Sequence, residues 1–262
     1  MRAIAISATL CLAASIAAAS DGLTIISKIT KDSSTTTATS YITQDHARWQ
    51  TPDGAMIMDP KAGTMTIVND TKKTYSVITK QDIDGAEAKI KEQMNSPEMQ
   101  KAQEAMKNMP PEQRARMESM MGGMFTVDVQ KLGTSRKVAG YNCEDWSVKI
   151  GQLSTTEECV TTEVKFPLQA WEMFRSWSDS MKSMMAAMGP MAKGMGNMQE
   201  QMKKIKGFPL ATKTTSSIMG HTSSSSTEVT EIKNGAIPAS AWEIPAGYTK
   251  TDSPMAQMGK RK

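Results

Sequence analysis

Methionine is the residue type whose number and spacing could support unusual chemistry in this sequence. The 262-residue chain holds 24 methionines but only five Trp, four Tyr and four Phe. Eight methionines fall between residues 94 and 124, and nine fall between residues 173 and 202. In the second block apolar residues recur at alternating steps of three and four, which is the spacing of a helical heptad stripe. The stripe consists of Phe174, Trp177, Met181, Met184, Met188, Met191, Met195, Met198, Met202 and Ile205.

The stripe has three interpretations. The simplest is a helix edge packed in the core, where any apolar residue would serve. Because methionine is unbranched and polarizable, the same edge could adapt to flexible apolar ligands such as acyl chains. Thioether sulfur also binds Cu(I) or reacts with oxidants. The pairs Met181/Met184, Met188/Met191 and Met195/Met198 each place two sulfurs on one helix face, but His and Cys are absent nearby.

Residues suited to catalysis are few and scattered. His46 and His221 are the only histidines, and they lie far apart in segments rich in Ser and Thr. Asp82 and Asp84 form a carboxylate pair, but their place before a helical pattern favours a helix N-terminal cap. No serine-nucleophile, zinc-protease or phosphate-loop motif is present. We therefore expect a non-enzymatic protein without catalytic, metal or cofactor-binding residues.

The first nineteen residues predict export. Arg2 precedes an apolar run, and Ala17-Ala18-Ala19 supplies small residues for cleavage, as in a secretory signal peptide. No other stretch is long and apolar enough to span a membrane, so we expect a periplasmic or secreted protein. The net charge of +4 is weak and dispersed, which argues against nucleic-acid binding.

Two cysteines, Cys143 and Cys159, remain after removal of the predicted signal peptide. Flanking residues alternate as in two half-buried strands, with even positions inward and both cysteines on the outer face. A hairpin folded about Gly151 would place the cysteines directly opposite each other, within reach of a disulfide. A redox-active pair would need closer spacing, so a structural disulfide is predicted.

The pattern along the chain alternates between strands and helices. Strand signals occupy residues 22–79, return between 125 and 166, and return again after 208, with helical insertions at about 82–122 and 168–206. This order predicts an α+β protein with one domain over residues 20–252, because the helices are the available cover for the sheet. The basic tail, residues 253–262, is expected to be disordered.

Several segments resemble one bacterial exported family, domain of unknown function 4412. They are Met65–Tyr75, Gly140–Cys143, Gly207–Leu210, Thr227–Lys233 and Ile237–Tyr248. The resemblance implies a fold like that of LolA, a curved antiparallel half-barrel whose concave face is covered by helices. It also implies binding of acyl chains or other apolar ligands. The methionine-rich helical segments depart from the family pattern, and the family supplies no catalytic residues.

Together these features predict a binding protein whose two methionine-rich helical segments pack on the concave face of a half-barrel. Its ligand would be a lipid or an acylated protein. The alternatives are Cu(I) binding or oxidant scavenging by methionine, and a structural or interaction protein without a ligand. The expected lining residues are Trp49, Trp146, Phe174, Trp177, Met181, Met184, Met188, Met191, Met195 and Met198.

Overall fold

Two antiparallel meanders make up most of the protein. The computed structural model describes residues 20–113, 126–166, 200–218 and 221–260. The strands of the first meander are β1 (Ser20–Lys31), β2 (Ser34–Ile42), β3 (Ala47–Thr51), β4 (Gly54–Asp59), β5 (Thr64–Asn69) and β6 (Thr74–Thr79). The strands of the second are β7 (Val127–Val138), β8 (Tyr141–Ile150), β9 (Ser154–Thr161), β10 (Phe208–Ile218) and β11 (His221–Ile237).

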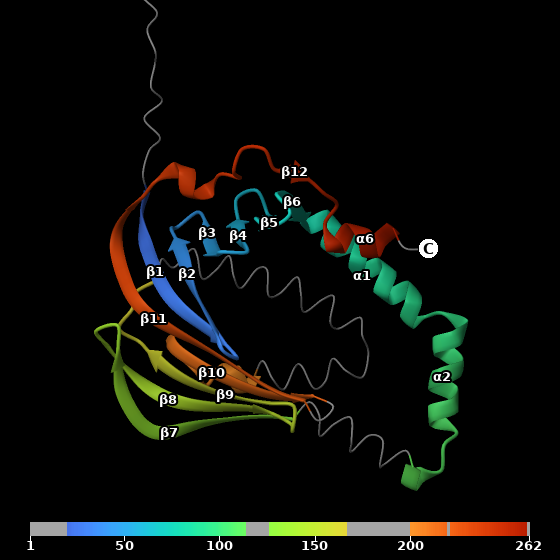
Figure 1. Cartoon of the computed structure of the whole chain (residues 1–262). Helices are drawn as coiled ribbons and strands as arrows, with labels where there is room; N and C mark the ends of the chain where they lie inside the picture. Colours follow the sequence, from blue (N-terminus) through green and yellow to red (C-terminus); the bar gives the residue numbers. More distant parts are fainter. Residues whose placement is uncertain (1–19, 114–125, 167–199, 219–220, 261–262) are drawn as a thin grey trace, which may run out of the picture.

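The meanders join into one twelve-stranded sheet. Strand β11 pairs with β1, and the short β12 (Thr249–Lys250) adds to β6 as the one parallel pair among the described strands. The strand order is β12-β6-β5-β4-β3-β2-β1-β11-β10-β9-β8-β7. Figure 1 shows that this sheet is strongly curved, and its two edges, β12 and β7, do not pair. The expected curved, unclosed antiparallel sheet is therefore confirmed.

The first helical insertion follows β6 directly. Helix α1 (Lys80–Met94) begins at a capping box, in which the Asp82 amide donates to the Thr79 hydroxyl and the Asp82 carboxylate accepts from the Thr79 amide. Asp82 thus has the predicted capping role, but the cap residue itself is Thr79. Asp84 instead pairs with Lys80 at 2.8 Å. Helix α2 (Pro97–Lys107) starts with a proline, as its missing amide hydrogen allows, and both helices run along the open side of the sheet (Figure 1).

The second insertion falls mostly outside the described residues. Residues 167–199 are not described, so the packing of that methionine-rich segment on the concave face stays a prediction. Residues 200–202, at its end, are helical. None of the described helices is long and apolar enough to cross a membrane.

The tail predicted to be disordered instead contains helix α6 (Pro254–Lys260). Ser253 is buried, and its hydroxyl accepts a hydrogen bond from the Ala256 amide at 3.0 Å, so the serine caps the helix. Pro254 occupies the first helical position, and α6 packs against α1. The expectation of disorder was wrong for these seven residues because a cap and a partner helix were both present.

Among the described residues, three apolar clusters hold the sheet together. The largest includes Ile25, Leu210, Val229 and both cysteines, and so bridges the two meanders. A second, around Ile57 and Val68, lies on the first meander. The third consists of Val127, Val129 and Val148, with Met202 and Ile205 packed against it. The last two positions of the methionine stripe therefore contact the sheet, as the core interpretation expects.

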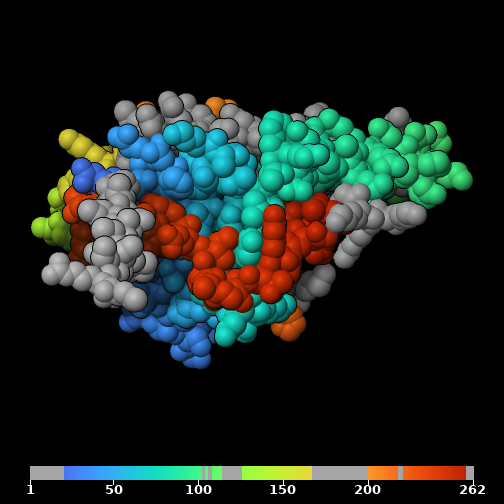
Figure 2. All heavy atoms as spheres, turned by 90° about the horizontal axis from the view of Figure 1, so that it is seen from above, coloured from blue at the N-terminus to red at the C-terminus, as the bar shows by residue number. Residues whose placement is uncertain are grey.

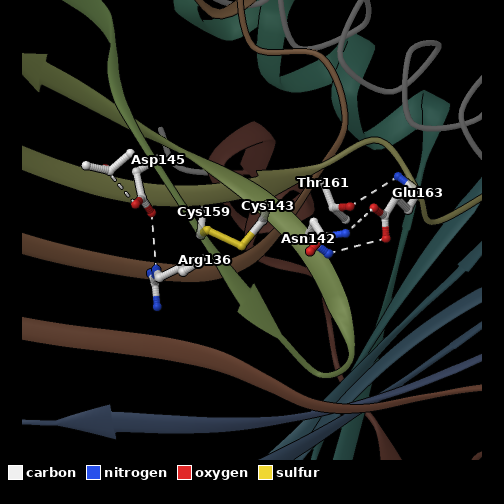
Figure 3. The surroundings of a disulfide bond; sticks show 8 residues. Arg136, Asn142, Cys143, Asp145, Cys159, Thr161 and Glu163 are labelled. Carbon is white, nitrogen blue, oxygen red and sulfur yellow. Dashed lines mark hydrogen bonds and ion pairs between the residues drawn. A yellow bond between two sulfur atoms is a disulfide. The ribbon is translucent and has the colours of Figure 1, made fainter.

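The predicted disulfide joins Cys143 and Cys159, whose Cα atoms lie 5.2 Å apart (Figure 3). The hairpin register differs from the expected one by two residues, because a three-residue loop makes Ile150 pair with Ser154. Cys159 consequently lies opposite Asp145, and the bond to Cys143 runs diagonally. The cysteines do occupy the opposite face of β8 and β9 from Trp146. They are not solvent-facing, however, since their exposed fractions are 2% and 0%.

Candidate functional site

A set of apolar side chains from the first meander shares one face of the sheet with Trp49. Directly opposed residues on neighbouring strands point to the same side. Trp49 lies opposite Met56, which lies opposite Ile67, and in the adjacent row Met58 lies opposite Met65. We call this side of the whole sheet the tryptophan face. On this face the methionine side chains of β4 and β5 thus lie on the strands next to the indole of Trp49.

The strand registers place Trp146 on the same face, although 97 positions of sequence separate it from Trp49. In β1, Ile25 shares a row with Trp49 through Ser40, and Ile29, four residues further along β1, points to the same side. A second row then crosses the remaining strands without an intervening bulge. Its members, in order, are Ile29, Thr227, Thr212, Glu158 and Trp146.

Exposure differs along the tryptophan face. Ile25 in the middle of the sheet is only 2% exposed, whereas Trp49 is 47% exposed. Met56, Met58 and Ile67 beside Trp49 are half-buried. Most large apolar side chains of a folded domain are buried more fully than this, so the region around Trp49 is an exposed apolar surface.

At the other end of the tryptophan face, Trp146 is partly buried against the Val127, Val129 and Val148 cluster. The remaining predicted lining residues, Phe174, Trp177, Met181, Met184, Met188, Met191, Met195 and Met198, lie outside the described residues. The structure thus brings the two predicted tryptophans to one face. Whether the face receives a ligand stays a prediction.

Glu158 is a polar residue of this face that the sequence patterns did not single out. It lies directly opposite Trp146 on β8 and opposite Thr212 on β10. Burial raises the pKa of its carboxyl above the usual value. Within the described part of the chain the carboxylate makes no hydrogen bond or ion pair. The alternation of apolar and polar residues in β9 signalled its face, but not its lack of a partner.

The opposite face of the first meander is covered by the end of the chain. We call residues 238–260 the C-terminal strap; it contains the 3-10 helix η1 (Ala239–Trp242), β12 and α6. Figure 2 shows the strap (red) lying beside the strands of the first meander and then beside α1. Trp242 and Tyr248 of the strap pack against the cluster of Ala55, Ile57 and Val68.

Arg48 attaches the strap to this opposite face. Its Nη1 donates to the carbonyl oxygens of Ala241 at 2.8 Å and Glu243 at 3.1 Å, and the residue is only 7% exposed. Burial lowers the pKa of the guanidinium, an effect that nearby Asp70 opposes. The same Asp70 accepts a hydrogen bond from the Tyr248 hydroxyl at 2.7 Å. These contacts make the strap part of the folded domain.

His46, one of two histidines considered for catalysis, also belongs to this attachment. Its ring stacks on Trp242 with centroids 5.1 Å apart, and its Nε2 lies 3.5 Å from an Asp59 carboxylate oxygen. His221 begins β11, at the β10–β11 hairpin. Among the described residues there is no group of three or more His, Cys, Asp or Glu side chains that could hold a metal.

Comparison with solved structures finds distant matches. PNGF-II aligns with a TM-score of 0.39 and 10% identity over 92% of this chain and 33% of its own. The MucA/MucB complex of Pseudomonas aeruginosa aligns with a TM-score of 0.38 and 13% identity, over 87% of this chain and 56% of the matched one. A DUF1329 family protein from Desulfovibrio piger gives 0.27 and 8%, over 86% and 90%.

The chain therefore spans about a third of PNGF-II and little more than half of the matched chain in the MucA/MucB complex. Comparison of the sequence with proteins of curated function finds no match. A family profile does match, over residues 96–248, which is more than half of the chain and includes the segments that carried the resemblance in the second meander and the strap. The protein belongs to the family described as a domain of unknown function, DUF4412.

Proposed function

We propose that this protein is an exported, non-enzymatic binding protein that takes up an apolar ligand on the tryptophan face. The ligand class is a lipid or the acyl chain of a lipidated protein. The observation that carries the proposal is the half-exposed Trp49 beside the half-buried Met56, Met58 and Ile67. Binding of an apolar chain to such a surface is favourable, because it removes apolar area from water.

The residue types in this region support a flexible ligand. Methionine side chains have several rotatable bonds and a polarizable sulfur, so they remould around guests of different shape. The indole of Trp49 adds a broad, rigid apolar surface. The disulfide is consistent with the proposed export, because such bonds persist in oxidising compartments.

The proposal is tested by native mass spectrometry of protein purified from the exported fraction of the cells that naturally make it. We expect adducts with the masses of lipids, and we expect the stripped protein to bind cis-parinaric acid, a fluorescent fatty acid. A protein that carries no adduct and takes up no parinaric acid would contradict the proposal.

A pair of variants locates the binding surface. Trp49→Ala should weaken parinaric acid binding several-fold, because it removes the largest exposed apolar side chain of the tryptophan face. Leu132→Ala is the matched control, since Leu132 is 46% exposed but lies in the bulged part of the edge strand β7. Equal losses in the two variants would show that the probe binds exposed apolar surface without preference for this face.

A further inference from the structure

The acidic Glu158 and the aromatic Trp146 lie opposite each other at the second-meander end of the tryptophan face. Directly opposed residues of antiparallel strands have Cβ atoms about 5 Å apart, so the carboxylate and the indole lie within reach of one small group. Thr212 faces Glu158 from the other side. A group lying over these three strands on the tryptophan face would therefore meet a negative charge, an aromatic ring and a hydroxyl.

The surroundings of this pair are apolar. Val148, two residues from Trp146 on the same side of β8, is buried, and Val160, two residues from Glu158 on β9, is buried as well. Met202 packs against the cluster that contains Val148. A carboxylate among such side chains is poorly solvated. Its charged form is stabilised only when a cation or several hydrogen-bond donors reach it.

The cationic residues on the neighbouring described strands do not pair with Glu158. Lys131 lies opposite Trp146, but its ammonium is 2.8 Å from the Glu144 carboxylate. Lys149 lies three residues from Trp146 in β8, and Lys213 lies next to Thr212 in β10. Because side chains alternate along a strand, both lysines point to the other face of the sheet. In the described part of the chain Glu158 is thus a partly buried carboxylate without a cationic partner, on the face where the ligand is proposed to bind.

We infer that the ligand carries an ammonium group, which sits between the Glu158 carboxylate and the Trp146 ring while its apolar chain lies on the tryptophan face. This inference rests on the proposed function and names the head group of the ligand. Both partners favour the same chemistry, because an ammonium forms a charge-assisted hydrogen bond with a carboxylate and a cation–π contact with an indole. An amine-headed lipid has both the cation and the chain, whereas a head group without a cation leaves the Glu158 carboxylate unpaired.

Two lysophospholipids with the same acyl chain test the head group. Lysophosphatidylethanolamine has an ammonium, and lysophosphatidylglycerol has hydroxyls in its place. Binding is measured by displacement of parinaric acid from the full chain, with each lipid below the concentration at which it forms micelles. We expect the ethanolamine lipid to bind about tenfold more tightly, which corresponds to one charge-assisted contact.

Adjacent glutamates in β9 provide the matched variants. Glu158→Gln should reduce the tenfold preference to near unity, because the amide keeps the shape of the side chain but not its charge. Glu157→Gln should leave the preference unchanged, since Glu157 is exposed and lies opposite Ser147 and Lys213 on the other face. Circular dichroism melts of all three proteins confirm that each one is folded.

The possible outcomes separate this inference from the proposed function. If both lipids bind equally to the unmodified protein, or if Glu158→Gln keeps the preference, the ammonium assignment is overturned and the binding function stands. If neither lipid nor parinaric acid binds to a folded protein, both are overturned. A preference that disappears with Glu158→Gln alone supports the assignment.

Discussion

The two ends of the sheet are secured in different ways. At the second meander, a disulfide joins neighbouring strands across 16 positions of sequence and lies within the largest apolar cluster. At the first meander, the C-terminal strap returns over nearly 200 positions and attaches through Arg48, whose partner carbonyl in Ala241 is 193 positions away. The first device is covalent and local, and the second is non-covalent and long-range.

This difference has a physical consequence. The disulfide restricts the unfolded chain and so acts before any tertiary contact forms. The strap stabilises only the folded state, because its hydrogen bonds require Arg48 to be in place on the sheet. We therefore expect the two ends to respond differently to reduction and to substitutions in the strap.

Removal of the disulfide should have the largest effect. Replacing both Cys143 and Cys159 with Ala should lower the free energy of unfolding by about 3 kcal/mol, because the unfolded chain regains the entropy of the closed loop. Urea unfolding of the oxidised protein and the double variant measures the difference. Added reductant should shift the midpoint of the unmodified protein but not that of the variant; equal midpoints for the two oxidised proteins would refute the expectation.

Substitution of Arg48 should have the next largest effect and should act on the strap. Arg48→Met keeps the apolar stem but removes both hydrogen bonds to the strap, at a cost of about 2 kcal/mol. Hydrogen exchange should accelerate in residues 239–250 more than in β7–β9. The control is Arg136→Met, which breaks the exposed ion pair with Asp145 and should cost less than about 0.5 kcal/mol. Comparable losses in the two variants would count against a structural role for the strap.

Loss of the α1 cap should have a smaller effect, at the first-meander end of the sheet. Thr79→Ala removes the hydroxyl that accepts from the Asp82 amide, and should cost about 1 kcal/mol. Because α6 packs on α1, faster hydrogen exchange is expected in both helices. If exchange changed in α1 alone, α6 would be held by the strap without help from α1.

The smallest effect is expected at Glu158, and it depends on pH. Burial raises the pKa of Glu158 in the folded state above the ordinary value of 4.5, which applies to the unfolded chain. The neutral carboxyl therefore makes its full contribution to stability below pH 4.5, and this contribution is lost as the pH rises through the folded-state pKa. Glu158→Gln should therefore be more stable than the unmodified protein at pH 7, by about 0.5 kcal/mol after allowance for solvent screening, and no more stable at pH 3.5.

Thermal unfolding at a series of pH values measures this difference. Glu157→Gln, on the exposed side of the same strand, should show no comparable trend. A gain in stability from Glu158→Gln that is independent of pH would show that burial of the charge is not its cause.

Local patterns in the sequence were sufficient for several features. Alternating apolar residues and turn signals located both meanders, and the two cysteines in adjacent strand patterns predicted their disulfide. The register within that hairpin was wrong by two residues, because the length of the turn at Gly151, and not the position of the glycine alone, sets the pairing. The same patterns indicated a face for each side chain but not what would cover that face.

The strands, the family and the covalent link thus follow from the sequence alone, because each depends on residues close together in the chain or on a motif. The folded structure adds the pairing of β11 with β1, which brings Trp49 and Trp146 to one face. It alone joined Arg48 to the strap and left Glu158 without a partner among the described residues. These features depend on contacts between distant segments, which periodicity and spacing along the chain do not encode.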